Sequence, residues 1–378
     1  MVIFLSIYLD NAATTPLCPE AIREMTRILS EQYGNPSSIY APGREALALL
    51  DAYRQTVAEA LGARPEEITF TSGGTEANNW AIRAAVHKLR RRGKHIVSTA
   101  IEHDSVRQTL AEMGQSGFEV TLVGPSKDGA VSVEDVCQAV RPDTVLVSVM
   151  LVNNETGVLQ PVSEIAGALR ASGSEALIHT DAVQAFMEIP FSPKELGIDL
   201  LSVSAHKIHG PKGVGALWKT PGLRLSPLLF GGQQEHGRRA GTEALHNIAG
   251  FAAAVTAAEA ADAGAHLRRL QAVLRETLKD VLPDASVLPM GAPQIASVSL
   301  PGCRSEVLMN DLDAQGIYIS RSSACKKGGR SHVLEAMRLP PAVIDGTIRV
   351  GFSRMNTEEE VRVFVLRLQE TKMRLFPG

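Results

Sequence analysis

The chain has 378 residues, with 38 basic and 41 acidic side chains and a formal net charge of -3. With acidic and basic residues so nearly balanced, the protein has no overall positive field to attract nucleic acid or anionic lipid. We therefore expect a small-molecule partner and no direct contact with nucleic acid. Apolar residues make up 44% of the chain, but no apolar stretch approaches the ~20 residues of a membrane-spanning helix, so we expect no membrane partner.

Residues 1–9 are apolar, but they lack a basic start and run into Asp10 without a clear cleavage site. We therefore expect no signal peptide. From residue 67 to 219, short β-branched runs alternate with amphipathic helical stretches. This alternation predicts an α/β fold with a mainly parallel, seven-stranded sheet. The expected strands are 68–70, 95–98, 120–123, 145–149, 177–180, 200–204 and 215–218, and the helices between them include 76–91, 105–115, 133–140 and 162–171.

Beyond residue 241 the pattern changes to an Ala-rich helical stretch, 244–282, broken by Gly250 and Gly264. Strands at 296–300, 318–320 and 347–352 then alternate with helices at 305–315, 331–337 and 357–374, which predicts a smaller α+β domain. The chain length also favours about two domains, at roughly 150 residues each. We expect a large domain at 16–245 and a small C-terminal domain at 246–378, with residues 1–15 packed on the small one.

Two neighbouring strands of the predicted sheet are followed by an acid and a lysine. Asp181 follows the apolar run 177–180, and Lys207 lies in a polar turn just past 200–204. These two side chains suit pyridoxal phosphate, because a carboxylate pairs with the protonated pyridine nitrogen and an amine binds the aldehyde as a Schiff base. Taken alone, Lys207 is equally consistent with a solvated loop lysine.

Other polar residues follow other strands. Gly74 and Thr75 open a helix after a Gly-rich turn, and the exposed amides of such a turn bind a phosphate. Ser204 and His206 would add further phosphate donors. His103 also follows a strand, and stacked on a pyridine ring it would tune the cofactor and move protons. A plain turn and a structural histidine are the alternatives.

Two residues suit a substrate carboxylate. Asn154 lies in the loop 153–157, where its amide would orient a carboxylate or the phenolic oxygen of the cofactor, although ordinary loops also use Asn and Gly. Arg349 lies in the apolar run 348–350, where a guanidinium is costly unless it is paired. A bidentate α-carboxylate is a suitable partner, and an internal salt bridge is the alternative.

In this order, the residues resemble the class V branch of fold-type I pyridoxal-phosphate enzymes, and closely the cysteine desulfurases of the nitrogen-fixation and iron-sulfur-cluster type. The resemblance covers nearly the whole chain and implies a fold-type I transferase. It is carried by residues 8–16 (YLDNAATTP), 34–38 (GNPSS), 75–79 (TEANN), 152–155 (VNNE), the Lys207 segment, 231–235 (GGQQE), 238–242 and Arg349.

The resemblance also implies a role for each matching residue. Lys207 resembles the Schiff-base lysine, Asp181 the partner of the pyridine nitrogen, and His103 the stacking acid/base residue. Gln184 is similar to the residue that binds the phenolic oxygen. The remaining matches are the phosphate ligands Thr75, Ser204 and His206, the substrate-carboxylate ligands Asn154 and Arg349, and Thr242, which reaches the phosphate of the other subunit. A site shared in this way implies a homodimer.

Residues 321–330 (RSSACKKGGR) resemble the Ser-Ala-Cys loop of the desulfurases. The resemblance implies that Cys325 takes the sulfur of L-cysteine as a persulfide, leaving alanine, and passes it to an acceptor protein such as a scaffold or a thiolation enzyme. Lys326, Lys327 and Arg330 would favour the thiolate. An idle loop cysteine is the alternative. Arg321 stands where small residues are usual and the loop is shorter than in many members, which leaves the rate and the acceptor open.

The other cysteines, Cys18, Cys137 and Cys303, lack basic surroundings, and we expect them to be structural. Four cysteines without metal-ligand spacing are too sparse for a disulfide framework, so we expect no metal and a reducing cytoplasm.

Three other functions fit parts of this pattern. A selenocysteine lyase or another carbon-sulfur lyase would keep Lys207 and Asp181 but need Cys325 less, and a transaminase would not need this cysteine. A catalytically idle partner-binding subunit would not need the Lys207, Asp181 and His103 set. The sequence leaves open whether sulfur goes to an iron-sulfur scaffold, tRNA thiolation, DNA modification or a vitamin.

Overall fold

The computed structural model describes residues 6–321 and 329–377. Its largest sheet has seven strands in the order β2-β8-β7-β6-β5-β3-β4, and all are parallel except β8, which runs antiparallel to both neighbours. The predicted α/β fold and mainly parallel sheet are confirmed. The strands are β2 (Ile68–Thr71), β3 (His95–Thr99), β4 (Glu119–Val123), β5 (Thr144–Ser148), β6 (Leu177–Asp181), β7 (Leu200–Ser204) and β8 (Gly215–Lys219).

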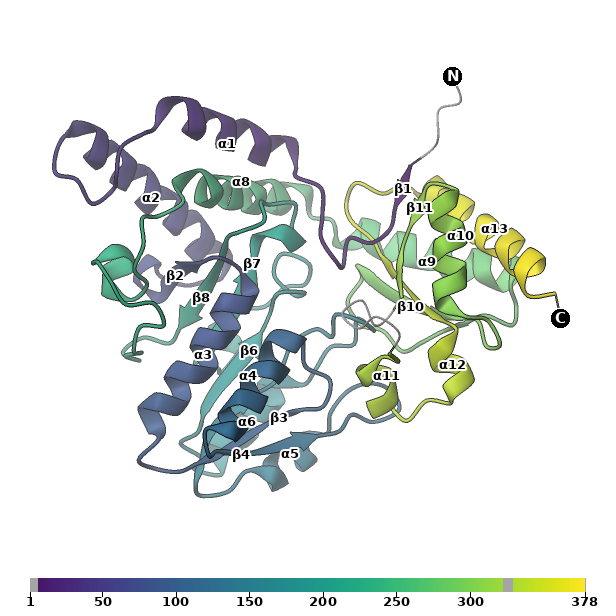
Figure 1. Ribbon diagram of the computed structural model, residues 1–378, viewed down its shortest axis with the longest axis horizontal. Coiled ribbons are helices and arrows are strands. Elements are labelled where there is room, and N and C mark those ends of the chain that lie inside the picture. The colour runs from purple at the N-terminus through teal and green to yellow at the C-terminus, as the bar shows by residue number, and fades with distance from the viewer. Residues whose placement is uncertain (1–5, 322–328, 378) are drawn as a thin grey trace.

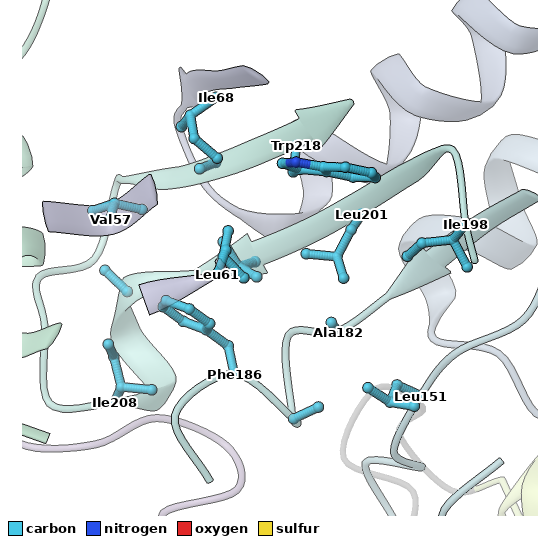
Figure 2. Close-up of a cluster of buried hydrophobic side chains, with 14 of the residues drawn as sticks. Val57, Leu61, Ile68, Leu151, Ala182, Phe186, Ile198, Leu201, Ile208 and Trp218 are labelled. Carbon is cyan, nitrogen blue, oxygen red and sulfur yellow. The ribbon is translucent and has the colours of Figure 1, made fainter. Parts of the chain in front are cut away.

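Helices cover both faces of this sheet (Figure 1). On one face, α3 (Gly74–Leu89) and α4 (Asp104–Gln115) bury apolar side chains such as Trp80 and Leu110 against the strands. The other face is covered by α1 (Pro19–Glu31), α2 (Ala41–Ala60), α5 (Val133–Ala139), α6 (Val162–Ala171), α7 (Pro193–Leu196) and α8 (Leu245–Ala261). Figure 2 shows part of this second core, where Phe186 and Trp218 lie among aliphatic side chains. Because both faces are covered, the strand residues are almost all buried, except in β4 at the edge of the sheet.

A second, smaller lobe is built on an antiparallel sheet with the strand order β12-β13-β10-β9. Its strands are β9 (Ser286–Val287), β10 (Ile295–Ser299), β12 (Ser320–Arg321) and β13 (Thr347–Gly351). Side chains of α9 (Gly264–Val281), α10 (Ser305–Ala314) and α13 (Glu358–Leu375) form its core. The short helices α11 (His332–Ala336) and α12 (Pro341–Asp345) complete this lobe, which lies on the right in Figure 1.

The N-terminal segment crosses from one lobe to the other. Strand β1 (Ile7–Tyr8) pairs in parallel with β11 (Ile317–Tyr318), and Ile7 and Leu9 are buried in the core of the smaller lobe. The following residues pass beside the main sheet, where the backbone N–H of Thr15 donates to the carbonyl of His206 at 3.0 Å. The same segment carries the backbone carbonyls of Ala12 and Ala13, which contact Lys207.

Two predicted elements differ in detail. The sequence predicts one strand at 318–320, but the structure has two short strands, because β11 pairs with β1 while β12 pairs with β13. The helical stretch 244–282 is divided at Asp262, which has a left-handed φ of 38°, whereas Gly250 lies inside α8. The division at residue 245/246 stays a prediction. Since α8 packs in the larger core and α9 in the smaller, the packing favours a boundary near residue 262.

Helices α1 and α2 were not predicted from the sequence. Both are amphipathic, with Ala21 and Ile28 of α1 and Leu50 and Val57 of α2 on their buried faces. Short 3-10 helices occur at Pro65–Glu67, Ala205–Lys207 and Gln234–Gly237. None of the helices in the described part of the chain is long and apolar enough to span a membrane.

Candidate active site

A cavity of about 550 Å³ lies at the carboxyl ends of β6 and β7, where ligands bind in open α/β sheets. The structure brings most of the predicted site residues to its wall, from segments far apart in the chain. These residues are Gly74, Thr75, His103, Asn154, Asp181, Gln184, Ser204, His206, Lys207 and Arg349. Of the remaining two, Thr242 does not line it, and Cys325 lies outside the described residues.

Lys207 is placed by the 3-10 helix Ala205–Lys207, which directly follows β7. Its Nζ donates hydrogen bonds to the carbonyl oxygens of Ala12 and Ala13, each at 2.7 Å. The carbonyl of Ala12 also accepts from Gln184 Nε2 at 2.9 Å. The N-terminal segment therefore holds the amine of Lys207 and the amide of Gln184 at one wall of the cavity.

Asp181 is the last residue of β6 and is buried. Its Oδ1 accepts from the backbone N–H of Val183 at 2.9 Å, and its Oδ2 accepts from Asn78 Nδ2 at 2.6 Å. Each oxygen of an ionised carboxylate can accept more than one hydrogen bond, so Asp181 can still accept from a ring N–H. Nearby Glu102 is fully buried, and burial raises its pKa to about 8, so it adds no second negative charge here near neutral pH.

One end of the cavity is suited to a phosphate. Gly73 has a φ of 144°, and a Cβ on Gly74 would lie 2.6 Å from Val183 Cγ2, so glycine is required at the start of α3. The first amides of α3 have no partner within the helix and present a positive dipole end. Burial, assisted by the charges of Lys207 and Lys212, lowers the pKa of His206 to about 4. His206 is therefore neutral near pH 7 and would act on a phosphate as a hydrogen-bond partner rather than as a charge.

Arg349 lies on β13 with its side chain buried. Its Nη1 donates to the carbonyl of Asn154 at 2.8 Å, and its Nη2 forms a salt bridge with Asp10 Oδ1 at 3.0 Å. The internal salt bridge that the sequence left as an alternative is thus present. Nε of Arg349 is buried without a hydrogen-bond partner among the described residues. A guanidinium fixed in this way at the cavity wall fits a substrate carboxylate.

The site contains residues that the sequence reasoning missed. Glu155 is buried in the cavity wall, where burial raises its pKa to about 7. It accepts a hydrogen bond from Ser331 Oγ, and Nδ1 of His332 lies 3.9 Å from its Oε1. Glu155 belongs to the Asn-Asn-Glu motif, which marked the loop, but no local pattern links it to a residue 176 positions away. Asn78, Ser105 and Lys212 also line the cavity.

The cysteines in the described part of the chain do not line the cavity. Cys18 and Cys303 are buried, and burial raises the pKa of Cys303 and of the half-buried Cys137. Raised thiol pKa values oppose a nucleophilic role at neutral pH. Lys326 and Lys327, like Cys325, lie outside the described residues. Arg330 lines the cavity and forms a bidentate salt bridge with Asp345, at 2.7 and 2.8 Å.

The segment that leads to Thr242 is attached beside the cavity by two ion pairs. Arg239 binds the carboxylate of Glu76 at 2.9 and 3.0 Å, one residue after Thr75. Glu235 forms a buried, bidentate salt bridge with Arg54 at 2.6 and 2.7 Å. Thr242 itself is exposed.

Comparisons with known proteins show the family and the fold of the chain. The family model described as Aminotransferase class-V matches residues 7–364. The chain belongs to this family. It is 41% identical to a protein named cysteine desulfurase IscS from Methanosarcina thermophila, over 94% of this chain and 89% of that protein.

Two solved structures are similar over most of the fold. A structure titled NIFS-like protein has a TM-score of 0.92 and 37% identity, covering 98% of this chain and all of that one. A structure titled SspA in complex with cysteine has a TM-score of 0.80 and 30% identity, covering 93% of this chain and all of the other. The fold is therefore that of the fold-type I pyridoxal-phosphate enzymes, as the sequence resemblance implied.

Proposed function

We propose that the chain is a pyridoxal-phosphate-dependent cysteine desulfurase, which moves the sulfur of L-cysteine to Cys325. The observation that carries the proposal is that Lys207, Asp181, His103 and Arg349 line one cavity. The similarity to proteins named cysteine desulfurase, and to a structure titled as a complex with cysteine, supports this substrate.

The residues present fit the cofactor. Asp181 would pair with the ring nitrogen, Gln184 with the phenolic oxygen, and Lys207 with the aldehyde. The start of α3 with Thr75, Ser204 and His206 would hold the phosphate. When bound, pyridoxal phosphate supplies an electron sink for an amino acid attached to it. The protein would position that sink, and the buried carboxylate of Asp181 would favour a protonated ring nitrogen.

The substrate end of the cavity fixes the amino acid by its carboxylate. Arg349 would bind it while held by Asp10 and the carbonyl of Asn154, so the guanidinium does not need to reorganise when substrate arrives. Asn154 would orient the same carboxylate. His103 would move protons at Nε2, because its Nδ1 already accepts the backbone N–H of Ser105 at 3.1 Å.

The net reaction balances without an external oxidant. The thiolate of Cys325 forms a bond with the sulfur of the substrate, the carbon-sulfur bond of the substrate breaks, and a hydrogen takes the place of sulfur on the carbon. Alanine and a persulfide on Cys325 result. An acceptor protein, such as a scaffold or a thiolation enzyme, would then remove the outer sulfur.

We also propose that two copies of the chain share their sites. Thr242 does not line the cavity of its own chain, yet its segment is fixed beside that cavity. Large apolar side chains are exposed on the same lobe, with Tyr33 and Ile39 each 89% and Phe230 84% accessible. If a second copy of the chain covers these side chains, Thr242 of one copy would lie near the phosphate site of the other.

The direct test is to incubate the purified protein with pyridoxal phosphate, L-cysteine and a thiol reductant and to measure alanine and sulfide. We expect equal amounts of both, and none from a Lys207→Ala variant. Sulfide formed without alanine, or alanine without sulfide, would contradict the proposal. Activity on selenocysteine but not on cysteine would favour the lyase alternative.

A further inference from the structure

His103 and Asp181 are joined by a continuous chain of hydrogen bonds inside the cavity wall. Asn78 Nδ2 donates to Asp181 Oδ2 at 2.6 Å and to Ser105 Oγ at 2.8 Å. Ser105 Oγ in turn lies 2.8 Å from His103 Nδ1. All four side chains line the cavity, and those of Asn78, Ser105 and Asp181 are buried. This series of hydrogen bonds therefore links the two residues, His103 and Asp181, that would contact the cofactor ring.

The direction of every bond in this chain follows from the atoms involved. An ionised carboxylate only accepts, so Asn78 presents its amide nitrogen to Asp181. The same nitrogen has a second hydrogen, which points to Ser105 Oγ. The hydroxyl of Ser105 accepts that bond, which leaves its own single hydrogen for His103 Nδ1.

A second, independent contact fixes the same ring atom. His103 is the N-cap residue of α4, and its Nδ1 accepts the backbone N–H of Ser105 at 3.1 Å. A backbone N–H can only donate, and it cannot turn away without breaking the start of the helix. Nδ1 therefore accepts from both the amide and the hydroxyl of Ser105. In a neutral imidazole the proton must then lie on Nε2.

We propose that Ser105 and Asn78 are positioning residues, which hold the proton of neutral His103 on Nε2 and fix the carboxylate of Asp181 relative to it. The inference deepens the proposed function and rests on it for the link to turnover. The resting histidine then offers a hydrogen-bond donor at Nε2. Accepting a proton on Nδ1 would require both donors of Ser105 to be displaced.

The tautomer can be measured without substrate, by recording the ring-nitrogen NMR signals of holoenzyme labelled with nitrogen-15 histidine at alkaline pH. The His103 signals are those that disappear in a His103→Gln variant. We expect a protonated Nε2 and an unprotonated, hydrogen-bonded Nδ1. In Ser105→Ala the Nδ1 signal should move toward that of a less hydrogen-bonded acceptor, and in Ser105→Thr, which keeps the hydroxyl, it should stay near its native position.

A matched control is Ser148→Ala. Ser148 Oγ also contacts a buried histidine, at 2.9 Å from His179 Nδ1, but neither residue lines the cavity. Ser105→Ala should lower kcat about fivefold, as expected for one hydrogen bond worth roughly 1 kcal/mol. Ser148→Ala should leave both kcat and the His103 signals unchanged. Asn78→Ala should alter the pH dependence of the visible absorption of bound cofactor, because Asp181 loses its 2.6 Å donor.

A native His103 protonated on Nδ1, or an Nδ1 signal that does not move in Ser105→Ala, would overturn the proposal. Unchanged turnover in Ser105→Ala would remove the positioning role. Because the NMR signals need no cysteine, their outcome is separate from that of the proposed function. An enzyme that shows the Nε2 tautomer but releases no sulfur from cysteine would contradict the proposed function alone.

Discussion

Replacing Asp181 with Asn tests the cofactor site most specifically. The carboxylate is buried and accepts hydrogen bonds at both oxygens, from Val183 and from Asn78. An amide at this position loses the charge that pairs with a protonated ring nitrogen. Whichever way the amide is turned, its NH₂ group also faces one of these two donors, so one of the two hydrogen bonds is lost.

The size of the effect follows from these contacts. A hydrogen bond to a charged group contributes about 1.5–3 kcal/mol to the binding free energy. A neutral hydrogen bond in its place would recover part of that contribution. A net loss of about 2 kcal/mol corresponds to roughly 30-fold weaker binding of pyridoxal phosphate. The measurement is a titration of cofactor-free protein with pyridoxal phosphate, followed by protein fluorescence and by visible absorbance.

The chain provides a matched control at the opposite end of the same strands. Asp199 accepts the backbone N–H of Ile178 at 2.8 Å and pairs with Arg170, but it does not line the cavity. Asp199→Asn should lower the melting temperature without changing cofactor affinity. Cofactor binding by Asp181→Asn within twofold of the native value would refute the assignment of Asp181 to the ring nitrogen.

Three further variants test other parts of the site. Arg349→Lys should raise KM for cysteine at least tenfold with a smaller change in kcat, because a lysine cannot bind a carboxylate bidentately; an unchanged KM would remove Arg349 from the substrate site. A mixture of Lys207→Ala and Thr242→Ala chains should regain activity that neither parent has, since heterodimers would contain one site with both residues intact; heterodimers without this gain would contradict the shared site. Burial raises the pKa of Glu155 from 4.5 to about 7. Between these two pH values the native state holds a proton on Glu155 that the unfolded chain has lost, so the contribution of Glu155 to stability falls as pH rises from about 4.5 to 7. Glu155→Gln keeps an acceptor for Ser331, so its melting temperature relative to the native protein should rise between about pH 5 and pH 8, and a constant difference would contradict the raised pKa.

The main sheet was predictable because each strand is a short apolar run bounded by polar turns. The run 200–204 is β7 itself, and the residues that follow it carry Lys207 into the cavity. The rule that ligands bind beyond the carboxyl ends of such strands predicted, from sequence alone, the edge of the sheet at which the cavity lies. The shared position of Asp181 and Lys207 follows from the pairing of β6 with β7.

Contacts across long sequence separations were not predictable. Asp10 pairs with Arg349 across 339 residues, and the carbonyls of Ala12 and Ala13 hold Lys207 from nearly 200 residues away. These contacts depend on the crossing of the N-terminal segment between lobes, which no local pattern indicates. Likewise, the separation of β11 from β12 is decided by the strands with which they pair.

The central claim concerns Cys325, and one measurement tests it directly. After addition of L-cysteine, peptide mass spectrometry should find an added sulfur on the Cys325 peptide of the native protein and none on the peptides with Cys18, Cys137 or Cys303. Cys325→Ser should still bind cofactor and cysteine, because Lys207, Asp181 and Arg349 remain, but it should release no sulfur. Full desulfuration of cysteine by Cys325→Ser, or an added sulfur on one of the other cysteines alone, would contradict the account.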